Sequence, residues 1–571
     1  MGIFLIAIGT GGIKPCVVAL GADQFKLPQQ AKALATYFAM FYASINIGSM
    51  VSTIAVPFLR RVPCFDEETC FSLAFGLPAG LMFVALILFW AGSWSYEVYI
   101  PEENIISIFF KCSWHAFWST KKGKEEHWLD KANDRFPQKT IDDIKAVYRV
   151  GVLFLFYPMF WALYDQQGTR WTIQAMKMNG DTFGWTILPD QMTVANPILI
   201  ILLIPLFDQI LYPALGKLRI FRTPLQRIVT GCFLCGAAFV VSGILELQLR
   251  KGYPVLAEQG QSKVILHNSL DTSCNFKFNN LESDTDYPVE VAALNSAFLI
   301  LPVAAYKLTS PSCLDPGNGD LEISEVGTNL LIAQIGEAKN VYVSLNEDEL
   351  DKNIEDPMPS LRLISTLGEC LLNTTLTIRG PVDAEDQTVH VDILQGSIGG
   401  NFQDFEARKL EAIGEYSYEV SGCFEQESQN LPERLEQGAN YNMAIVGDQQ
   451  TGLRLVWYRV TEPNSIHIFW LLPQYLVISV CEVLFSITSL EFAYSQAPTT
   501  MKSVLQSLYL MTTAVGNLIT VLIVEIFLEI GWEQVIFFFI IPIVVMMIVM
   551  KCCSTLSSSH LPALCSSSAS L

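Results

Sequence analysis

The sequence predicts an all-α membrane protein, built as a bundle of helices, with a β-sandwich domain inserted into it. Three observations lead to this prediction. Only 16% of the 571 residues are charged, whereas an average soluble domain carries about 25%. Apolar stretches long enough to cross a bilayer recur along the chain. An acidic region with short, strand-like runs separates the last of these stretches from the others.

The apolar stretches predict about nine membrane helices. A membrane-spanning helix needs roughly 20 mainly apolar residues, and nine stretches meet this requirement, the first of them barely. The predicted spans lie at about 1–20, 36–59, 72–95, 151–173, 191–214, 227–248, 466–490, 501–527 and 533–551.

Charge is distributed very unevenly along the chain. Residues 252–463 contain 33 Asp and Glu against 12 Lys and Arg, a balance of −21, while the whole chain has a net charge of −20. The rest of the chain is therefore close to neutral, at about +1. An acidic surface argues against nucleic-acid binding, because that binding needs Lys and Arg to displace counterions from phosphates.

Basic residues in short loops predict the orientation, since such loops usually face the cytoplasm. The 216–227 loop has four basic residues and no acid, so we place it in the cytoplasm. The 96–150 segment falls on the same side, where its amphipathic pieces predict a helical linker. The loops on the other side are then extracellular: 60–71, 174–190 and 249–465.

The acidic insertion is predicted to be β structure. Its short runs alternate between apolar and polar residues or are rich in β-branched residues, and turn residues separate them. The clearest runs are 340–345, 374–378, 388–394 and 453–458. About 210 residues of short strands suggest two β-sandwich lobes.

Cysteine positions agree with an extracellular insertion. The insertion contains four cysteines, an even number that predicts two disulfides in an oxidising space, with a connectivity that the sequence leaves open. A third bridge is expected within the 60–71 loop. Asn373 begins an Asn-Thr-Thr acceptor for glycosylation in the same insertion. The candidate cysteines are Cys64 and Cys70 in the loop, and Cys274, Cys313, Cys370 and Cys423 in the insertion.

Glu482 is the first candidate functional residue. Apolar residues surround it for at least a helical turn on each side. A carboxylate inside a membrane span is costly unless it faces a wet cavity or a partner. We therefore expect Glu482 to carry protons or bind a cation; the alternative is an acid paired with a neighbour purely for helix packing.

Five further polar residues, in three groups, lie inside predicted spans. Asp165 and Arg170 belong to an aromatic run that ends at Trp171. Anchoring at the membrane interface would explain Trp171, but it explains the polar residues of the run poorly. Tyr42 and Asn46 are four residues apart and share one face of a helix; the glycine and serine that follow them favour helix packing instead. Asn196 precedes a proline that we expect to interrupt its span, and an amide at such a break often lines a cavity.

An enzyme is not predicted. The six histidines are scattered without an i, i+4 metal-ligand pair, and neither a nucleophile elbow nor a phosphate-binding loop occurs. We expect no catalytic residue, no metal and no cofactor.

Several motifs together resemble the proton-coupled oligopeptide transporters, the POT or PTR family. The segment 9–25 resembles the first signature of that family and 41–49 the second. The runs 160–171 and 482–498 resemble the intestinal and renal peptide transporters of animals, as does the large β-rich insertion. The resemblance implies a major facilitator-type fold. It also implies symport of di- and tripeptides with protons across the plasma membrane by alternating access.

The resemblance also implies roles for individual residues in binding the peptide. Glu482 would hold the amino terminus of the peptide, with Asn196 beside it. Tyr42 and Asn46 would contact the peptide backbone, and Trp161 would line a side-chain pocket.

Proton coupling and gating are implied for a second set. Lys14 would lie near the peptide carboxylate and the proton path, together with Glu482 itself. Glu491 and Lys502 would be charges of the inner gate. Asp165 and Arg170 are further candidates.

Aligned with the family, the nine spans correspond to helices four through twelve, so we expect the chain to lack the first three of twelve helices. The expected sections are the remainder of an N-terminal bundle, a cytoplasmic linker, the first part of a C-terminal bundle, an extracellular domain, the last three helices and a cytoplasmic tail. Their ranges are 1–95, 96–150, 151–249, 250–465, 466–553 and 554–571.

A second class of function stays open. The chain could be a truncated, non-transporting isoform that senses peptides or binds a protein at the cell surface, because its acidic β-rich domain suits an extracellular protein partner. The expected partners are otherwise peptides, protons and membrane lipid.

Overall fold

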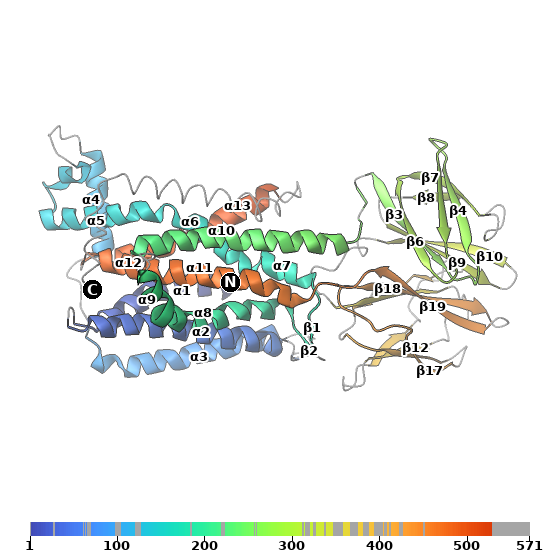
Figure 1. The fold of residues 1–571 in the computed structure, drawn as a ribbon, viewed down its shortest axis with the longest axis horizontal. Helices are drawn as coiled ribbons and strands as arrows, with labels where there is room; N and C mark the ends of the chain where they lie inside the picture. The colour runs from blue at the N-terminus through green and yellow to red at the C-terminus, as the bar shows by residue number, and fades with distance from the viewer. Residues whose placement is uncertain are drawn as a thin grey trace. The chain divides into compact units, whose positions relative to one another are not determined.

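The computed structural model divides the chain into two compact units, one helical and one rich in strands (Figure 1). The helical unit comprises residues 1–172, 190–245 and 471–571, and the strand-rich unit comprises 173–189 and 246–470. The structure describes residues 2–527 except 27–28, 61, 63, 65–69, 98–103, 120–126, 183–184, 218–222, 256, 259, 311–312, 314–319, 324–326, 336–337, 347–357, 366–374, 381–387, 393–402, 405–407, 410–412, 422–425, 449–451 and 499.

The helical unit contains long apolar helices joined by short turns. Its helices before the insertion are α1 (Gly2–Ala22), α2 (Ala31–Arg60), α3 (Phe71–Ala91), α4 (Ile105–Trp118), α5 (Gln138–Phe154), α6 (Tyr157–Tyr164), the start of α7 (Arg170–Met176), α8 (Ala195–Leu206), α9 (Tyr212–Lys217) and α10 (Pro224–Leu249). Those after it are α11 (Leu472–Glu482), α12 (Thr488–Gln496) and α13 (Lys502–Phe527). The short helical turns η1 (Ser93–Ser95), η2 (Trp128–Ala132), η3 (Asp165–Gly168) and η4 (Pro189–Val194) connect them.

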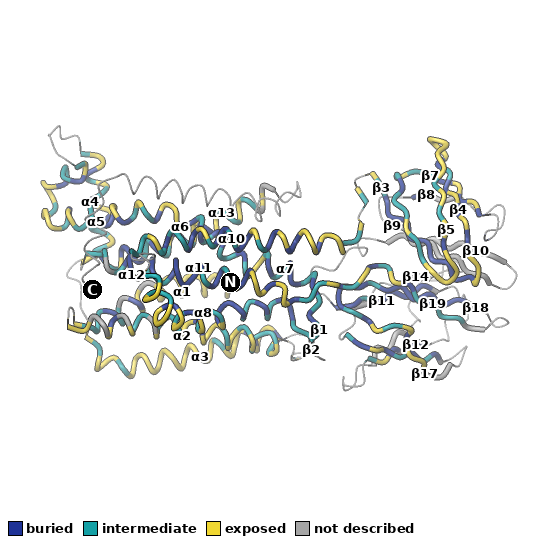
Figure 2. The backbone as a smooth tube through the Cα atoms, in the orientation of Figure 1, coloured by how far each residue is buried: buried dark blue, intermediate teal, exposed yellow. Residues whose placement is uncertain are grey.

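Within the described residues, seven helices are long and apolar enough to cross a membrane, or eight if one bent pair counts as a single span. Helix α3 is apolar all round and exposed along most of its length (Figure 2), as expected of a helix that faces lipid. Seven predicted spans coincide with these helices. The predicted span at 533–551 lies outside the described residues.

The remaining predicted span, 151–173, is not one straight helix. Helices α5 and α6 meet at an angle of 45°. Pro158 stands at the start of α6, where it lacks the N–H that a continuous helix would need and its ring crowds the preceding turn. The η3 turn then breaks the helix a second time at Asp165.

The predicted span at 191–214 changes from the η4 turn to α8 just before Asn196 and Pro197, so the irregularity precedes these residues and does not lie at them. Both residues lie in the first turn of α8, where a proline is tolerated because its missing N–H has no partner within the helix anyway. The span is irregular elsewhere: a π-helical turn, η5, covers Phe207–Leu211. A second π-helical turn, η10 (Val483–Ile487), joins α11 to α12.

Close contact between α6 and α13 depends on a glycine. A Cβ atom at Gly516 would lie 2.6 Å from the carbonyl oxygen of Pro158 and 2.9 Å from the Cβ of Trp161. Glycine therefore lets the two helices approach within backbone contact, and this approach fixes the position of Trp161.

The strand-rich unit consists of four larger sheets and one small hairpin. Two sheets have the strand orders β10-β9-β3-β6 and β5-β4-β7-β8, and two have the orders β14-β11-β18-β19, with β15 also on β11, and β13-β12-β16-β17. The first pair uses β3 (Gln261–Asn268), β4 (Cys274–Asn280), β5 (Asp286–Val291), β6 (Ser296–Pro302), β7 (Ala304–Thr309), β8 (Asp320–Ile323), β9 (Gly327–Ile335) and β10 (Ala338–Asn346). The second uses β11 (Ser360–Ser365), β12 (Thr375–Arg379), β13 (Thr388–Asp392), β14 (Gln403–Asp404), β15 (Arg408–Lys409), β16 (Ser417–Ser421), β17 (Gln426–Asn430), β18 (Asn440–Asp448) and β19 (Gly452–Thr461). The hairpin joins β1 (Asp181–Thr182) to β2 (Trp185–Thr186).

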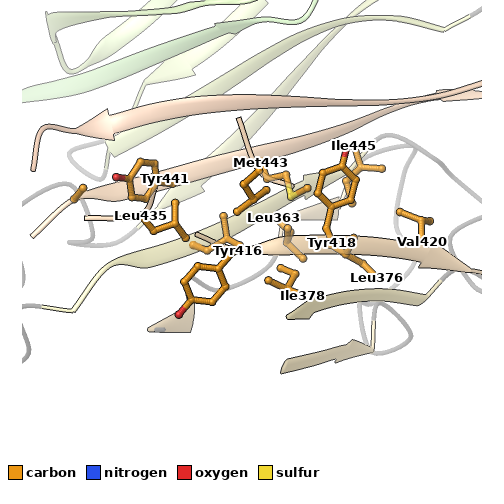
Figure 3. Close-up of a cluster of buried hydrophobic side chains, with 13 residues drawn as sticks. Leu363, Leu376, Ile378, Tyr416, Tyr418, Val420, Leu435, Tyr441, Met443 and Ile445 are labelled. Carbon is orange, nitrogen blue, oxygen red and sulfur yellow. The ribbon is translucent and has the colours of Figure 1, made fainter. Parts of the chain in front are cut away.

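Each pair of sheets shares one apolar core. In the second pair, alternate residues of β11 and β18 meet those of β12 and β16, with Leu363, Leu376, Tyr418 and Met443 among them (Figure 3). In the first pair, inward-facing residues of β3 and β4, such as Leu266 and Phe276, form a separate buried core. The runs predicted at 340–345 and 453–458 fall within β10 and β19. Those predicted at 374–378 and 388–394 coincide with β12 and β13 except for 374, 393 and 394, which lie outside the described residues.

Among the residues that the structure describes, two disulfides are formed. Cys64 is bonded to Cys70 in the loop between α2 and α3, with Cα atoms 5.2 Å apart. In the strand-rich unit Cys274 is bonded to Cys313, with Cα atoms 5.8 Å apart. Cys370, Cys423 and the acceptor Asn373 lie outside the described residues.

We expect Gly516→Val to lower the stability of the helical unit by about 1–3 kcal/mol, because a branched side chain would push α13 away from α6. The measurement is the thermal unfolding temperature of the purified protein in detergent. Gly151→Val in α5 is the matched control, since no heavy atom lies within 4 Å of its Cβ position. An equal loss in both variants would contradict the close-packing argument.

Candidate functional site

The carboxylate of Glu482 is buried between three helices. Glu482 ends α11 and is 5% exposed. The hydroxyl of Tyr42 on α2 donates to its Oε1 at 2.5 Å, and the amide Nδ2 of Asn196 on α8 donates to its Oε2 at 2.9 Å. Each oxygen therefore has its own donor, which stabilises a carboxylate that apolar surroundings would otherwise destabilise.

Further polar groups extend this network. Tyr164 at the end of α6 lies within electrostatic range of the carboxylate of Glu482. The amide of Asn196 lies 3.2 Å from the hydroxyl of Ser479, one turn before Glu482. Helices α2, α6, α8 and α11 thus converge on one carboxyl group.

The local helix geometry explains how Glu482 presents its side chain. The π-helical turn η10 begins at the next residue, Val483. A π turn adds one residue to a helical turn and is frequent at functional sites. It shifts the side chains after Glu482 relative to those before it, so Glu482 and Phe485 both reach the interior of the unit, where Phe485 is fully buried.

Tyr42 and Asn46 both lie on the inward side of α2, but they do different things. Tyr42 is half-buried and reaches Glu482. Asn46 is 6% exposed, and its amide donates to the backbone carbonyl of Tyr42 at 2.9 Å. Gly48, the glycine that follows Asn46, was expected to allow close helix packing. No heavy atom of the described residues lies within 4 Å of its Cβ position, so no helix packs closely against it there.

An aromatic cluster lies beside the carboxylate. The ring of Phe160 stacks on Phe485 with centroids 3.6 Å apart, and the ring of Trp161 meets Phe485 at 6.0 Å and Tyr509 at 6.2 Å. The indole N–H of Trp161 donates to Thr512 on α13 at 3.1 Å, which fixes the orientation of the ring. The cluster forms an aromatic wall next to a charged group.

Three other predicted residues, Asp165, Lys14 and Arg170, make no hydrogen bond with Glu482 among the described contacts. Asp165 lies within electrostatic range of Asn517 on α13, of Lys14 and of Glu482. Lys14 is exposed on α1, and Arg170 is half-buried at the start of α7.

The anchoring role expected for Trp171 is wrong. Its side chain is fully buried and packs against Phe239 of α10 and Tyr475 of α11, at 5.5 and 5.1 Å between ring centroids. Packing between helices has overridden the preference of tryptophan for the membrane interface.

The two predicted inner-gate charges belong to separate clusters. The ammonium of Lys502 lies 3.1 Å from Asp23, just after α1, and 2.8 Å from the hydroxyl of Tyr494. Glu491 instead lies in the electrostatic range of Arg227 and Asp208. The first cluster joins the N-terminal helices to α13, and the second stays within the later helices.

Tyr164, Ser479, Asp23 and Tyr509 belong to the site but are not among the predicted residues. Tyr164 stands inside the aromatic run, one residue before Asp165, where tyrosines are too common to indicate a function. Ser479 lies three residues before Glu482 and therefore on the same helix face, which was a usable signal. Asp23 lies in the 9–25 segment that resembles a family signature, but nothing near it in the sequence indicates a partner on α13, and Tyr509 carries no local signal. Among the described residues, no group of three His, Cys, Asp or Glu could hold a metal ion.

Comparison with known proteins shows consistent similarities. The sequence profile of the POT family (PTR2) matches residues 1–287 and 441–536. Mouse solute carrier family 15 member 2 is 35% identical over 564 residues, which cover 94% of this chain and 72% of that protein. Solute carrier family 15 member 1 of the dog is 35% identical over 542 residues, covering 92% and 72%. The crystal structure of the POT family transporter PepTSo aligns with a TM-score of 0.51 at 19% identity, over 98% of this chain and 79% of that one, which supports the fold.

We expect Asn196→Leu to destabilise the helical unit by about 1–3 kcal/mol, because it removes one donor from a buried carboxylate. In a Glu482→Leu background the same change should have much less effect, since the acceptor is gone. The measurement is a double-mutant cycle of thermal unfolding in detergent.

Asn46→Leu is the matched control for this cycle, because the Asn46 amide serves a backbone carbonyl instead of Glu482. Its effect should be the same with and without Glu482. Equal coupling of Asn46 and Asn196 to Glu482 would contradict the network described above.

Proposed function

The chain belongs to the POT family, and on this premise we propose that it carries small peptides across a membrane together with protons. The observation that carries the proposal is the buried carboxylate of Glu482, held by Tyr42 and Asn196. A membrane-embedded acid with neutral donors and no described cation in hydrogen-bond contact is suited to accept either a proton or an ammonium group.

The two ends of a peptide require opposite charges. Glu482 would bind the α-amino group, with Asn196 and Tyr42 keeping the carboxylate in position. Lys14 would attract the peptide carboxylate. Every unmodified peptide has a positive amino end and a negative carboxyl end. A site that binds these two ends therefore accepts peptides of many sequences.

Side chains of the peptide would meet the aromatic wall. Trp161 is held by Thr512 and lies beside Phe485 and Tyr509. Aromatic faces accept apolar side chains of different shapes with little directional demand. Asn46 would act through the backbone of Tyr42, which makes it a positioning residue in this proposal.

Proton coupling would follow from competition at Glu482. The carboxyl group binds a proton or the peptide ammonium, and Asp165 offers a second protonatable group near Lys14. Inward movement of one positive charge supplies about 2.3 kcal/mol per 100 mV of membrane potential.

The ion pair of Lys502 with Asp23 connects α13 to the end of α1. It would have to break when the halves of the helical unit separate on the inner side, so we assign it to the inner gate. Glu491 would act there only indirectly, through Arg227.

The orientation of the chain is part of the proposal. Counting the described spans in order, with the bent pair as one span, puts the Cys64–Cys70 loop and the strand-rich unit on the same side of the membrane. Both carry a disulfide, and disulfides persist in oxidising, extracellular surroundings. We therefore place the strand-rich unit outside the cell and the chain in the plasma membrane, in contact with lipid through its exposed apolar helices.

We expect cells expressing this chain to take up a labelled dipeptide faster when the outside medium is mildly acidic than when it is neutral. Glu482→Gln should raise the concentration for half-maximal uptake roughly tenfold or more, because it removes a buried charge that pairs with the peptide ammonium. The measurement is initial uptake rate at both pH values, normalised to protein at the surface.

Lys263→Met in the strand-rich unit is the control for this experiment, since Lys263 is remote in sequence from every proposed transport residue and belongs to the other unit. Unchanged uptake in Glu482→Gln at full surface expression would refute the role of the carboxylate. Uptake without any pH dependence would refute proton coupling.

Removing the strand-rich domain distinguishes transport from surface sensing. We expect uptake to survive deletion of residues 253–464, because the β-rich domain contributes no residue to the proposed transport site. The Cβ position of Gly252 lies 3.9 Å from the hydroxyl of Ser465, so a short linker can join the two ends without strain.

A second deletion that removes only 327–346, strands β9 and β10 and their turn, controls for misfolding of a partial domain. Loss of uptake in the complete deletion, at normal surface expression, would favour a function that resides in the strand-rich unit.

A further inference from the structure

Helix α4, in the linker between α3 and α5, has two apolar faces, and one of them is buried. Phe109, Cys112 and Ala116 are at most 5% exposed, and their spacing of three and four residues puts them on one side of the helix. The ring of Phe109 stacks on Tyr148 of α5 with centroids 5.4 Å apart, and α4 also packs against η2. This buried face attaches α4 to the rest of the linker.

The second apolar face of α4 is exposed and mainly aromatic. Phe110, Trp114, Phe117 and Trp118 are 64–72% exposed, and Ile106 precedes them on the same side of the helix. We call these five residues the aromatic face of α4. A cluster of exposed apolar side chains usually marks a surface that contacts a membrane or a protein. The question is therefore which of these covers the aromatic face.

The linker starts at the end of the membrane helices. Just after α1, the side chain of Gln24 exchanges two hydrogen bonds with the backbone of Glu97: its Nε2 donates to the carbonyl at 3.0 Å, and its Oε1 accepts from the N–H at 2.9 Å. Helix α4 begins eight residues later, a stretch that reaches about 28 Å at most. Figure 1 shows α4 lying across this end of the helical unit, crosswise to its long helices.

The contact with α5 places α4 beside exposed apolar surface. Tyr148, which Phe109 covers, lies one helical turn before Val152 on the same face of α5. Val152 and Leu155 are exposed, and α5 continues with α6 as one bent membrane span. Helix α4 therefore lies one turn away from the point where α5 presents apolar side chains to lipid, so the lipid surface continues towards it.

The charges near the aromatic face favour an acidic surface. Residues 104–124 contain four lysines and no acid: Lys111, Lys121, Lys122 and Lys124. Lys111 is exposed and lies three and seven residues before Trp114 and Trp118, so it shares their side of the helix. A cluster of four or more basic residues beside an amphipathic helix is typical of binding to acidic lipid headgroups.

The described acids near α4 are engaged on its other side. Asp130 of η2 pairs with Lys145 of α5 at 2.5 Å, and Asp134 lies 3.1 Å from Nε2 of His115. Both acids belong to the part of the linker that packs against the buried face of α4. The acids at 125–126 lie outside the described residues. The described acids thus leave the aromatic face without a negative charge of its own.

The dimensions and composition of α4 suit the surface of a bilayer. Its 14 residues are too few to cross the hydrocarbon core, which needs roughly 20. Tryptophan is enriched at the membrane–water interface. A helix with Trp and Phe on one face and lysines nearby lies in the plane of that interface, with its apolar face among the headgroups and upper acyl chains.

We propose that α4 is an interfacial helix that binds acidic phospholipids. Its aromatic face inserts at the headgroup level, and the four lysines pair with acidic headgroups. This attachment holds the linker against the membrane surface between the helices that precede and follow it. The proposal goes beyond peptide transport and does not depend on it. With the strand-rich unit outside the cell, the leaflet concerned is the cytoplasmic one, where acidic lipids are concentrated.

Amide hydrogen exchange tests this proposal on the full chain in nanodiscs that hold one copy each. One set of discs contains phosphatidylcholine alone, and the other contains phosphatidylcholine mixed with phosphatidylserine. We expect the amides of α4 to exchange roughly tenfold or more slowly in the acidic discs, because bound headgroups oppose local opening of the helix. The amides of η2 and of α10 should exchange equally in both sets.

A first variant, in which the four lysines are changed to glutamine, should lose the difference between the two sets of discs. Its control has the same number of basic residues changed to glutamine elsewhere in the linker and should keep the difference. The residues changed in the control are Lys131, Arg135, Lys139 and Arg149. Unchanged exchange in η2 and α5 shows that the buried face of α4 is still packed.

A second variant tests the aromatic face itself. Trp114→Ala together with Trp118→Ala should make α4 exchange faster in both sets of discs. Alanine favours a helix more than tryptophan does, so faster exchange reports lost contact with lipid and not a weaker helix.

Four results would overturn the proposal. Two concern charge: equal exchange of α4 in both sets of discs, or a difference that survives in the lysine variant. The third is unchanged exchange after both tryptophan substitutions. The fourth is protection of α4 that appears only with two copies in a disc or after a cytosolic protein is added, because a protein would then cover the aromatic face.

Discussion

The burial of one carboxylate organises the helical unit. Glu482 lies in an apolar helix, where an unsolvated charge would cost several kcal/mol. Tyr42 and Asn196 replace the missing water with hydrogen bonds from two other helices, and Tyr164 of a third helix lies within electrostatic range. Those helices must therefore stay close together, and the network couples the N-terminal helices to the helices on both sides of the insertion.

The irregular parts of the helices serve this arrangement. The bend between α5 and α6 and the turn at Asp165 break one span twice, and π turns interrupt two others. Each break frees backbone groups and redirects side chains, which is tolerated in a membrane where the segment lines a polar interior. Gly516 then brings α13 against α6, so that Trp161 and Thr512 complete the aromatic wall.

The strand-rich unit is built on a different principle. Its apolar cores lie between pairs of sheets, and its excess negative charge stays on the outside of those cores. The POT family profile omits residues 288–440, which all lie in this unit. A domain whose two ends lie side by side can be inserted without disturbing a bundle.

Composition and periodicity are enough to assign the broad class of this protein. Long apolar runs, low overall charge and one acidic, strand-like insertion are properties of composition and periodicity, and they led to membrane helices and to strands at the positions found. Glu482 was also recognisable, since a lone acid within an apolar run stands out without any knowledge of its neighbours. The resemblance in motifs agreed with the family that the comparisons support.

Which residues meet depends on how the helices and sheets pack. Lys502 pairs with Asp23, Tyr164 reaches Glu482, and Trp171 is buried between helices instead of anchoring at the interface. The two helix breaks and the role of Asn196 at the start of α8 likewise depend on packing. The reason is physical: composition and periodicity report the solvent that a segment prefers, whereas a hydrogen bond or an ion pair depends on distances of about 3 Å between residues far apart in the chain.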